Sequence, residues 1–471
     1  MASDIRLTAE WVAAAMAGTI VAGRRTAEFS GVSIDTRTLR TGELYIGIRG
    51  DRFDGADFAD AAVAAGAGGI VVPRTWDWKG GLSGVVVPVV IVVDDTTEAL
   101  QALAHSTRQA SGTKVVAITG SAGKTTTKEV TAEFLGAKYR VIRNRGNLNN
   151  HIGLPLSLME LTARPDIAVV ELGMNHAGEI STLVRIAEPD VRVWTNVGEA
   201  HLGFFASVET IADAKAEILE GAAPDSVLVA NVDDELVASR ARKFAGRVVT
   251  FSIERSADIR ADRVIDAGIE GTNARVTTPK GAFDLRTPLV GRGNLSNILA
   301  ATAVGVHFDV PLPAIAERAA ALKPAHHRGE VVRLGRGVVI IDDSYNANPT
   351  ATRSSIEVLR RSETRGRRVA VLGEMLELGD RAIALHRRVG EEAAASGVDE
   401  LVAIGGPPAR ELAEAAEAMG LILGEVHHFE TSDEAANAFA SYVRAGDLVL
   451  VKGSRGVRTD IVVDRLKAEF A

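Results

Sequence analysis

The chain has 471 residues, and its 61 acidic side chains against 53 basic ones give a formal net charge of −8. This acidic balance argues against nucleic-acid binding as the main role, and the lack of cysteine excludes disulfides, thiolate metal sites and a cysteine nucleophile. We find no signal-peptide pattern and no charge-free apolar run of about 18 residues that could span a membrane. The sequence therefore predicts a cytoplasmic enzyme of roughly three domains.

Residues 1–110 are expected to form a small α/β domain. Apolar runs at 44–48, 69–72 and 85–93 predict strands, and the alanine-rich segment 56–65 predicts a helix. The stretch 109–113 is short, small and polar, as linkers are. We therefore predict a linker at the end of this domain.

A glycine-rich turn follows the apolar segment 115–119, which predicts a buried parallel strand. The turn leads directly into a helical pattern over 124–135. Backbone N–H groups at such a helix N-terminus bind phosphate, and glycines let the backbone come close to the phosphate oxygens. Lys124 supplies a positive charge, and the Thr125 hydroxyl can ligate Mg²⁺. The sequence therefore predicts a phosphate-binding loop formed by Gly120, Ser121, Ala122, Gly123, Lys124, Thr125 and Thr126.

This loop is shorter than the common one. The common P-loop has a glycine six residues before its lysine, and this chain has Ile118 there. The difference argues against a generic motor protein or a small GTPase.

Residues 111–323 alternate strand and helix patterns, as a central, doubly wound parallel sheet requires. Segment 248–290 is richer in glycine, threonine and alternating residues, and predicts antiparallel strands. Strands are expected at 167–171, 191–196 and 226–231, and helices at 177–187, 208–220 and 294–306.

Residues 324–471 predict a second open parallel sheet, in a C-terminal Rossmann-like α/β domain. Its strands are expected at 338–342, 368–372, 401–404 and 448–451, and its helices at 350–361, 382–395, 409–419 and 432–444.

Polar residues gather where several of these strands end. Glu171 ends a strand of the central domain, where it could ligate Mg²⁺ beside the phosphate loop. Amide-rich residues 146–151, the loop 342–349 and residues 452–455 also follow strands. Because ligands bind at the carboxyl ends of parallel strands, these loops suggest one cleft shared by two domains. His201 and Lys215 would not define a site by themselves, because a helical lysine is usually a surface residue.

The motifs, taken together, are similar to those of one family. They include Thr-Gly-Ser-Ala-Gly-Lys-Thr-Thr at 119–126, Gly-Asn-Leu-Asn-Asn at 146–150, Glu-Leu-Gly at 171–173, residues 196–201, Lys215 and residues 293–297. They continue with Asp-Asp-Ser-Tyr-Asn-Ala-Asn-Pro at 342–349 and Val-Lys-Gly-Ser-Arg at 451–455. Along nearly its whole length the chain resembles the Mur ligases of peptidoglycan synthesis. The last two motifs are most similar to those of the member that joins D-alanyl-D-alanine to UDP-N-acetylmuramoyl-tripeptide.

The resemblance implies a division of labour among three domains. The first would hold the UDP end of the nucleotide sugar-peptide, the second would bind ATP and Mg²⁺, and the third would receive the dipeptide. The reaction would pass through an acyl phosphate. We expect a monomer that needs no nucleic-acid partner.

The resemblance also implies residue roles. Lys124, His201 and Lys215 would be catalytic, with Lys215 carbamylated by CO₂ so that its carboxylate bridges to a second Mg²⁺ held by His201. Thr125 and Glu171 would hold the first Mg²⁺. The remaining residues would be Asn297, Arg328 and Asp343 for ATP; Ser33, Thr36, Arg37, Asn147 and Asn149 for the UDP-sugar; and Asn346, Asn348, Lys452, Ser454 and Arg455 in the dipeptide loops. Ala200 departs from the aspartate of sister ligases, so that position has no catalytic role here.

Three alternatives remain open. The sister ligase that adds a diamino acid carries an Asp-Asn-Pro-Arg string, which is absent here. A folylpolyglutamate synthase would prefer folates as substrates. A P-loop NTPase acting as a switch would hydrolyse ATP in response to a protein partner and ignore nucleotide sugars.

Overall fold

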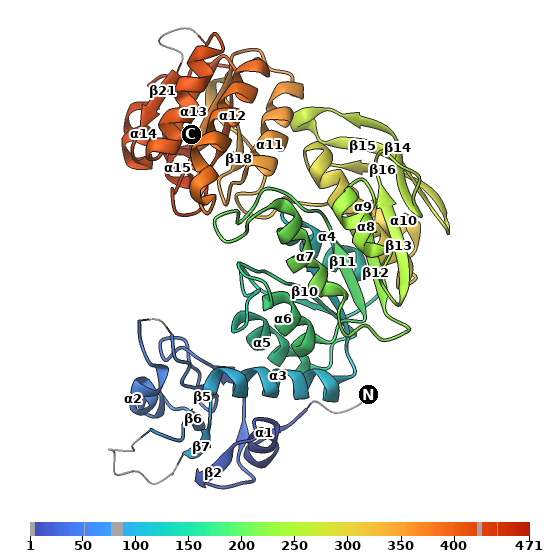
Figure 1. Cartoon of the computed structure of the whole chain (residues 1–471), viewed down its shortest axis with the longest axis vertical. Coiled ribbons are helices and arrows are strands. Elements are labelled where there is room, and N and C mark those ends of the chain that lie inside the picture. The colour runs from blue at the N-terminus through green and yellow to red at the C-terminus, as the bar shows by residue number, and fades with distance from the viewer. Residues whose placement is uncertain (1–4, 51, 77–87, 422–425, 440) are drawn as a thin grey trace.

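The computed structural model describes residues 5–50, 52–76, 88–421, 426–439 and 441–471. Three main sheets follow one another along an elongated molecule, with the N-terminal part at one end and the C-terminal part at the other (Figure 1). Their strand orders are β2-β7-β6-β5-β4, β16-β15-β14-β13-β12-β11-β8-β10-β9 and β17-β18-β22-β19-β20-β21. This arrangement confirms the three-part α/β fold class.

The N-terminal sheet is parallel except for β2, which pairs antiparallel with β7. The segment 56–65 forms a 3-10 turn that continues into a helix, and the predicted strand 85–93 begins at Val89 in the described residues, since 85–87 lie outside them. The elements are β1 (Leu7–Thr8), α1 (Ala9–Ala15), β2 (Thr19–Ala22), β3 (Glu28–Phe29), β4 (Val32–Ser33), β5 (Leu44–Ile46), α2 (Ala59–Ala64), β6 (Gly69–Pro73) and β7 (Val89–Val93).

The predicted linker at 109–113 is wrong. Helix α3 (Thr96–Ser111) runs through it and ends only where Gly112 adopts a left-handed conformation, φ 69°. One face of α3, including Leu100, Leu103 and Thr107, is buried, and the helix lies between the N-terminal sheet and the central part (Figure 1). Arg108 donates to the Ala187 carbonyl and to Asp190, so the end of this helix is bonded to the central part.

Strand β8 lies in the middle of the central sheet, between β10 and β11. Valine, isoleucine and alanine dominate these strands, which are buried on both faces by helices, as a parallel sheet requires. The elements are β8 (Lys114–Thr119), α4 (Lys124–Leu135), β9 (Val141–Arg143), α5 (Gly153–Leu158), β10 (Ile167–Glu171), α6 (Glu179–Ala187), β11 (Val191–Trp194), α7 (Val208–Ala216), β12 (Val227–Asn231), α8 (Glu235–Ala241), α9 (Gly291–His307) and α10 (Leu312–Ala320).

The antiparallel prediction for 248–290 is wrong for its first strand. β13 (Arg247–Ser252) runs parallel to β12, because α8 supplies the crossover that a parallel pair needs, and it also pairs parallel with β14 (Ile259–Asp266). Only β14, β15 (Thr272–Thr278) and β16 (Gly281–Thr287) pair antiparallel.

The C-terminal sheet is parallel except at β17, which pairs antiparallel with β18. The helix predicted over 432–444 ends at Phe439, with residue 440 outside the described residues. The elements are β17 (Glu330–Arg333), β18 (Val339–Asp343), α11 (Pro349–Arg361), β19 (Arg368–Gly373), α12 (Ala382–Ala395), β20 (Glu400–Ile404), α13 (Pro407–Ala418), β21 (Val426–Phe429), α14 (Ser432–Phe439), β22 (Leu448–Lys452) and α15 (Asp460–Glu469). In the described part of the chain, no helix is both long and apolar enough to cross a membrane.

Candidate active site

Two glycines shape the loop between β8 and α4. Gly120 and Gly123 have φ of 155° and 80°, and the second lies in the region that favours glycine. A Cβ on Gly120 would come within 1.9 Å of the Thr195 hydroxyl, and one on Gly123 within 2.3 Å of the Asn297 amide oxygen. Asn297 also accepts a hydrogen bond from Thr127 at 3.1 Å. The fold thus brings Asn297 of α9 to the phosphate loop, where the sequence predicts a nucleotide contact.

The phosphate loop is held from the neighbouring strand β11. The Asn196 side chain accepts from the Ala122 N–H at 2.8 Å and donates to the Ala122 carbonyl at 3.0 Å. The Ser121 hydroxyl accepts from the Gly198 N–H at 2.9 Å. We did not predict a role for Asn196. Its position at the end of a strand beside β8 is the signal that could have identified it.

Lys124 lies at the start of α4, and its Nζ donates to the Gly120 carbonyl at 2.8 Å. Burial lowers the pKa of Lys124, the charge of Glu171 opposes this, and the charge of Arg328 adds to it. Arg328, from the segment between α10 and β17, therefore lies near the loop, with its guanidinium 4.0 Å from the Tyr345 ring centre. Two cations at one glycine-rich loop form a site suited to a polyphosphate.

Thr125 and Glu171 face each other across the strand ends. The Thr125 hydroxyl donates to one carboxylate oxygen of Glu171 at 2.8 Å, and the Asn149 amide donates to the other at 2.8 Å. Asn144 accepts from the Glu171 N–H and fixes this strand end. A hydroxyl and a carboxylate beside a phosphate loop are hard oxygen donors that fit Mg²⁺. Asn149, predicted for the UDP-sugar, thus lies at the candidate metal site.

Lys215 is buried in α7 with 1% of its surface exposed. Its Nζ makes no hydrogen bond or ion pair with any residue that the structure describes. Burial and then the charge of Lys124 lower the pKa of Lys215 well below the ordinary value, against the opposing charge of Glu171. The snorkelling alternative is therefore wrong, because this lysine faces the site and holds a readily neutral amine.

His201 lies at the interface with the C-terminal part. Its Nδ1 is 2.7 Å from a carboxylate oxygen of Glu377, which follows β19. This contact lowers the pKa of Glu377. No pattern in the sequence singles out Glu377, because it follows its strand in an ordinary Met-Leu-Glu-Leu-Gly segment.

The polar loops of the C-terminal part come together because β18 and β22 are neighbours, with Asp343 opposite Lys452. The Lys452 ammonium donates to the Asp343 carboxylate at 2.5 Å and to the Asn346 carbonyl at 3.1 Å. The Ser454 hydroxyl accepts from Leu376 N–H. Asn348 accepts from the Ala351 N–H and caps α11, so Asn346 and Arg455 are the exposed members of this set.

Comparison with known proteins identifies the family. Three models match consecutive parts of the chain: the Mur ligase family catalytic domain over 28–108, the Mur ligase middle domain over 118–305, and the Mur ligase glutamate ligase domain over 327–455. A Bacillus subtilis UDP-N-acetylmuramoyl-tripeptide–D-alanyl-D-alanine ligase is 36% identical over 442 residues, 93% of each chain. The chain belongs to the Mur ligase family.

Solved structures of Mur ligases match it over nearly the whole length. A crystal structure of MurF from Acinetobacter baumannii superposes with a TM-score of 0.88 at 30% identity, covering 99% of this chain and 100% of that one. MurF from Thermotoga maritima in complex with ADP gives 0.80 at 30% identity, covering 93% and 97%.

The turn predicted to bind UDP lies in the N-terminal part of this Mur ligase, between β4 and β5. Ser33 is buried and shares hydrogen bonds with the Asp35 backbone. Arg37 pairs with the Asp35 carboxylate at 2.7 Å, which lowers the pKa of Asp35 to about 2. Thr36 is half-buried in the same turn, while Asn147 is exposed in the central part. The turn therefore gathers Ser33, Thr36 and Arg37 but not Asn147.

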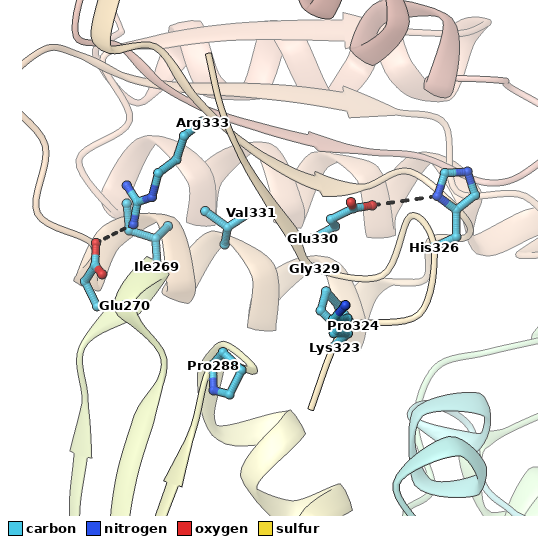
Figure 2. A pocket seen from close by; sticks show the side chains of 10 residues that line it. All are labelled: Ile269, Glu270, Pro288, Lys323, Pro324, His326, Gly329, Glu330, Val331 and Arg333. Atoms are coloured by element: carbon cyan, nitrogen blue, oxygen red, sulfur yellow. Dashed lines mark hydrogen bonds and ion pairs between the residues drawn. The ribbon is translucent and has the colours of Figure 1, made fainter. Parts of the chain in front are cut away.

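A cavity of about 540 Å³ lies on a different side of the Mur ligase, where the chain passes from α10 to β17 (Figure 2). The tip between β14 and β15 and the segment from Lys323 to Arg333 line it, and ion pairs join Arg333 to Glu270 and His326 to Glu330 (Figure 2). None of the phosphate-loop residues lines this cavity, so it lies at the connection between the central and C-terminal parts and not at the candidate active site.

Proposed function

We propose that the chain is an ATP-dependent ligase that joins D-alanyl-D-alanine to UDP-N-acetylmuramoyl-tripeptide in peptidoglycan precursor synthesis. The observation that carries this proposal is the built phosphate loop with its Thr125–Glu171 pair. The name of the B. subtilis relative supplies the substrates, and the ADP in the T. maritima structure supports ATP as the phosphoryl donor.

The chemistry requires activation of a carboxylate, which is a poor electrophile. The terminal carboxylate oxygen of the tripeptide attacks the γ-phosphorus of ATP; ADP leaves and an acyl phosphate forms. The neutral amine of D-alanyl-D-alanine then attacks the acyl carbon, phosphate leaves and the amine loses a proton. Lys124, Arg328 and the N–H groups of the loop would stabilise charge on the phosphoryl oxygens. Because water hydrolyses an acyl phosphate, the C-terminal part must cover the site.

Bound Mg²⁺ would neutralise phosphate charge and orient the reacting oxygens. Thr125 and Glu171 would hold one ion, and His201 with a carbamylated Lys215 would hold a second. Carbamylation forms an N–C bond between the neutral Lys215 amine and CO₂ with loss of a proton, and gives an anionic oxygen pair. The burial and lowered pKa of Lys215 support this step, because the neutral amine is the form that reacts.

The proposal assigns the UDP end to the N-terminal turn with Ser33, Thr36 and Arg37, assisted by Asn147 and Asn149. Asp343 and Asn297 would contact ATP, and Asn346, Asn348, Lys452, Ser454 and Arg455 would form the dipeptide side. Domains of 1–110, 111–323 and 324–471 would carry these three tasks. We further propose that the enzyme acts as a monomer. A cytoplasmic location is part of the proposal, since ATP and UDP-sugars are cytoplasmic metabolites.

A phosphate-release assay tests the proposal. Wild-type enzyme with ATP, Mg²⁺ and D-alanyl-D-alanine should turn over with UDP-N-acetylmuramoyl-tripeptide, but not with a folate or with the muramyl dipeptide and a diamino acid. Lys124→Ala should lose about 10²–10³ in rate, roughly 3–4 kcal/mol of transition-state stabilisation, with an unchanged circular dichroism spectrum. ATP turnover that ignores the nucleotide sugar, or an active Lys124→Ala, would contradict the ligase.

A further inference from the structure

His201 and Glu377 belong to different parts of the chain and meet at the interface between them. His201 follows β11 of the central sheet, and Glu377 follows β19 of the C-terminal sheet. Their side chains approach to 2.7 Å between Nδ1 and a carboxylate oxygen. The imidazole is 19% exposed and the carboxylate 47% exposed, so the contact lies at the rim of the interface.

Backbone geometry holds both residues at this contact. His201 and Glu377 have φ of 60° and 64°, in the left-handed region that side chains other than glycine seldom adopt. The Glu377 carbonyl also accepts from the Gly203 N–H at 2.7 Å. A Cβ on Gly379 would come within 2.9 Å of the Gly203 Cα, so the two loops touch along their backbones. Such conformations persist only where the surrounding structure fixes them, and they occur most often at functional sites.

The proposed function assigns a metal ion to His201, and the following inference rests on that function. A histidine that binds a metal through one ring nitrogen usually gives the other to a carboxylate, which fixes the tautomer and the ring orientation. We propose that Glu377 is the positioning residue for His201: it accepts a hydrogen bond from Nδ1–H and leaves Nε2 free to bind the ion. Because Glu377 lies on the C-terminal part, His201 is oriented only when that part is docked.

A neighbouring contact provides a matched control. The Arg381 guanidinium donates to the Ala206 carbonyl at 2.5 Å and joins the same two loops without touching His201. If Glu377 only held the loops together, Glu377→Ala and Arg381→Ala would have similar effects. If Glu377 positions His201, only the Glu377 variant will alter the metal site.

The experiment combines kinetics with metal binding. We expect Glu377→Ala to lower kcat by about 10- to 100-fold, with an almost unchanged KM for the UDP-tripeptide. Glu377→Gln should retain more activity because its amide oxygen can still accept from Nδ1–H. In His201→Ala enzyme, adding Glu377→Ala should change kcat by no more than about twofold, because the two residues act through one group. Arg381→Ala should stay within about threefold of wild type.

Electron paramagnetic resonance supplies a readout that does not depend on ligation. With Mn²⁺ and ADP, Glu377→Ala should weaken one Mn²⁺ site by about 10- to 100-fold and Arg381→Ala should not. Unchanged Mn²⁺ binding in folded Glu377→Ala and Glu377→Gln, or full additivity with His201→Ala, would overturn the inference. A wild type that fails to ligate would instead contradict the proposed function, so the two failures are distinguishable.

Discussion

Lys215 is a residue whose chemistry depends on where the fold places it. An ammonium at this position would repel Mg²⁺, whereas a carbamate offers the oxygen ligands that the ion prefers. We expect Lys215→Ala to be nearly inactive and to be partly rescued by short-chain carboxylic acids that fill the vacated space. Rescue should depend on the size of the acid and not on ionic strength. A fully active Lys215→Ala enzyme, or a plain lysine by mass spectrometry under bicarbonate and Mg²⁺, would refute this role.

The stability of a second variant, Lys215→Met, shows whether a loss of activity at this position comes from unfolding. In the absence of bicarbonate and Mg²⁺, the lowered pKa means that folded protein binds fewer protons at Lys215 than unfolded protein, whose lysine titrates near 10.5. The free energy of unfolding therefore rises with pH between the lowered pKa and 10.5. The apolar Lys215→Met should raise stability by about 1–2 kcal/mol at neutral pH, less as pH approaches 10.5. If Lys215→Met is inactive and melts at a higher temperature than wild type, its loss of activity cannot come from unfolding.

Strand patterning was sufficient to place some residues of the candidate site, though not to test their roles. Lys124 follows buried strand β8 within a few residues and Glu171 ends buried strand β10, so both were predicted at one sheet edge. Asn196 and Glu377 act on partners 74 and 176 residues away. A periodicity argument cannot see such contacts, because they depend on strand order and on domain docking.

The same limit explains the errors at the level of elements. Small polar residues at the end of α3 have a linker's composition, but Ser111 is buried and accepts from the Thr113 N–H, so tertiary packing extended the helix. Strand β13 is half-exposed and alternating, which predicts an antiparallel strand, yet the missed helix α8 reverses the chain before it. In both segments, packing against another element overrode the local pattern.

Two asparagines near the start of α11 are expected to affect different properties of the protein. Asn346 is exposed in the loop after β18, whereas Asn348 caps α11. Asn346→Ala should raise the KM for D-alanyl-D-alanine several-fold and leave both the melting temperature and UDP-tripeptide affinity unchanged. Asn348→Ala should instead lower stability by about 1 kcal/mol, through the lost cap.

Calorimetric titration of the UDP-tripeptide and thermal melts check both asparagine variants. Lys452→Ala should impair turnover through both ATP and the dipeptide, because the Lys452 ammonium holds the Asp343 carboxylate and the Asn346 carbonyl. If Asn346→Ala or Lys452→Ala lost UDP-tripeptide affinity as strongly as turnover, our proposal would have assigned the substrates to the wrong parts of the molecule.

At the scale of the whole molecule, the three parts are joined in different ways. The N-terminal and central parts share helix α3, and one apolar core includes buried residues of all three parts, among them Leu100, Ile180 and Val358. The C-terminal part is reached through the segment beside the cavity in Figure 2, and it also meets the central part through polar contacts. These include the Ile269 N–H to Ser362 bond at 3.0 Å and ion pairs of Glu199 with Arg353 and Arg388. We therefore expect the position of the C-terminal part to depend in part on these polar contacts.

Glu199 tests that expectation because it lies two residues before His201 and holds two arginines of the C-terminal part, at 3.1 and 2.5 Å. Glu199→Gln removes the charge that balances the two arginines, and these half-buried ion pairs should each contribute at least the roughly 0.2–1 kcal/mol that is typical of exposed pairs. We expect a larger radius of gyration by small-angle scattering and a several-fold lower kcat/KM. High salt should enlarge wild type toward the variant, because ions screen these pairs. Glu254→Gln, which breaks an ion pair with Arg292 inside the central part, should change neither quantity. An unchanged radius in Glu199→Gln at low salt would show that the closed arrangement does not depend on these charges.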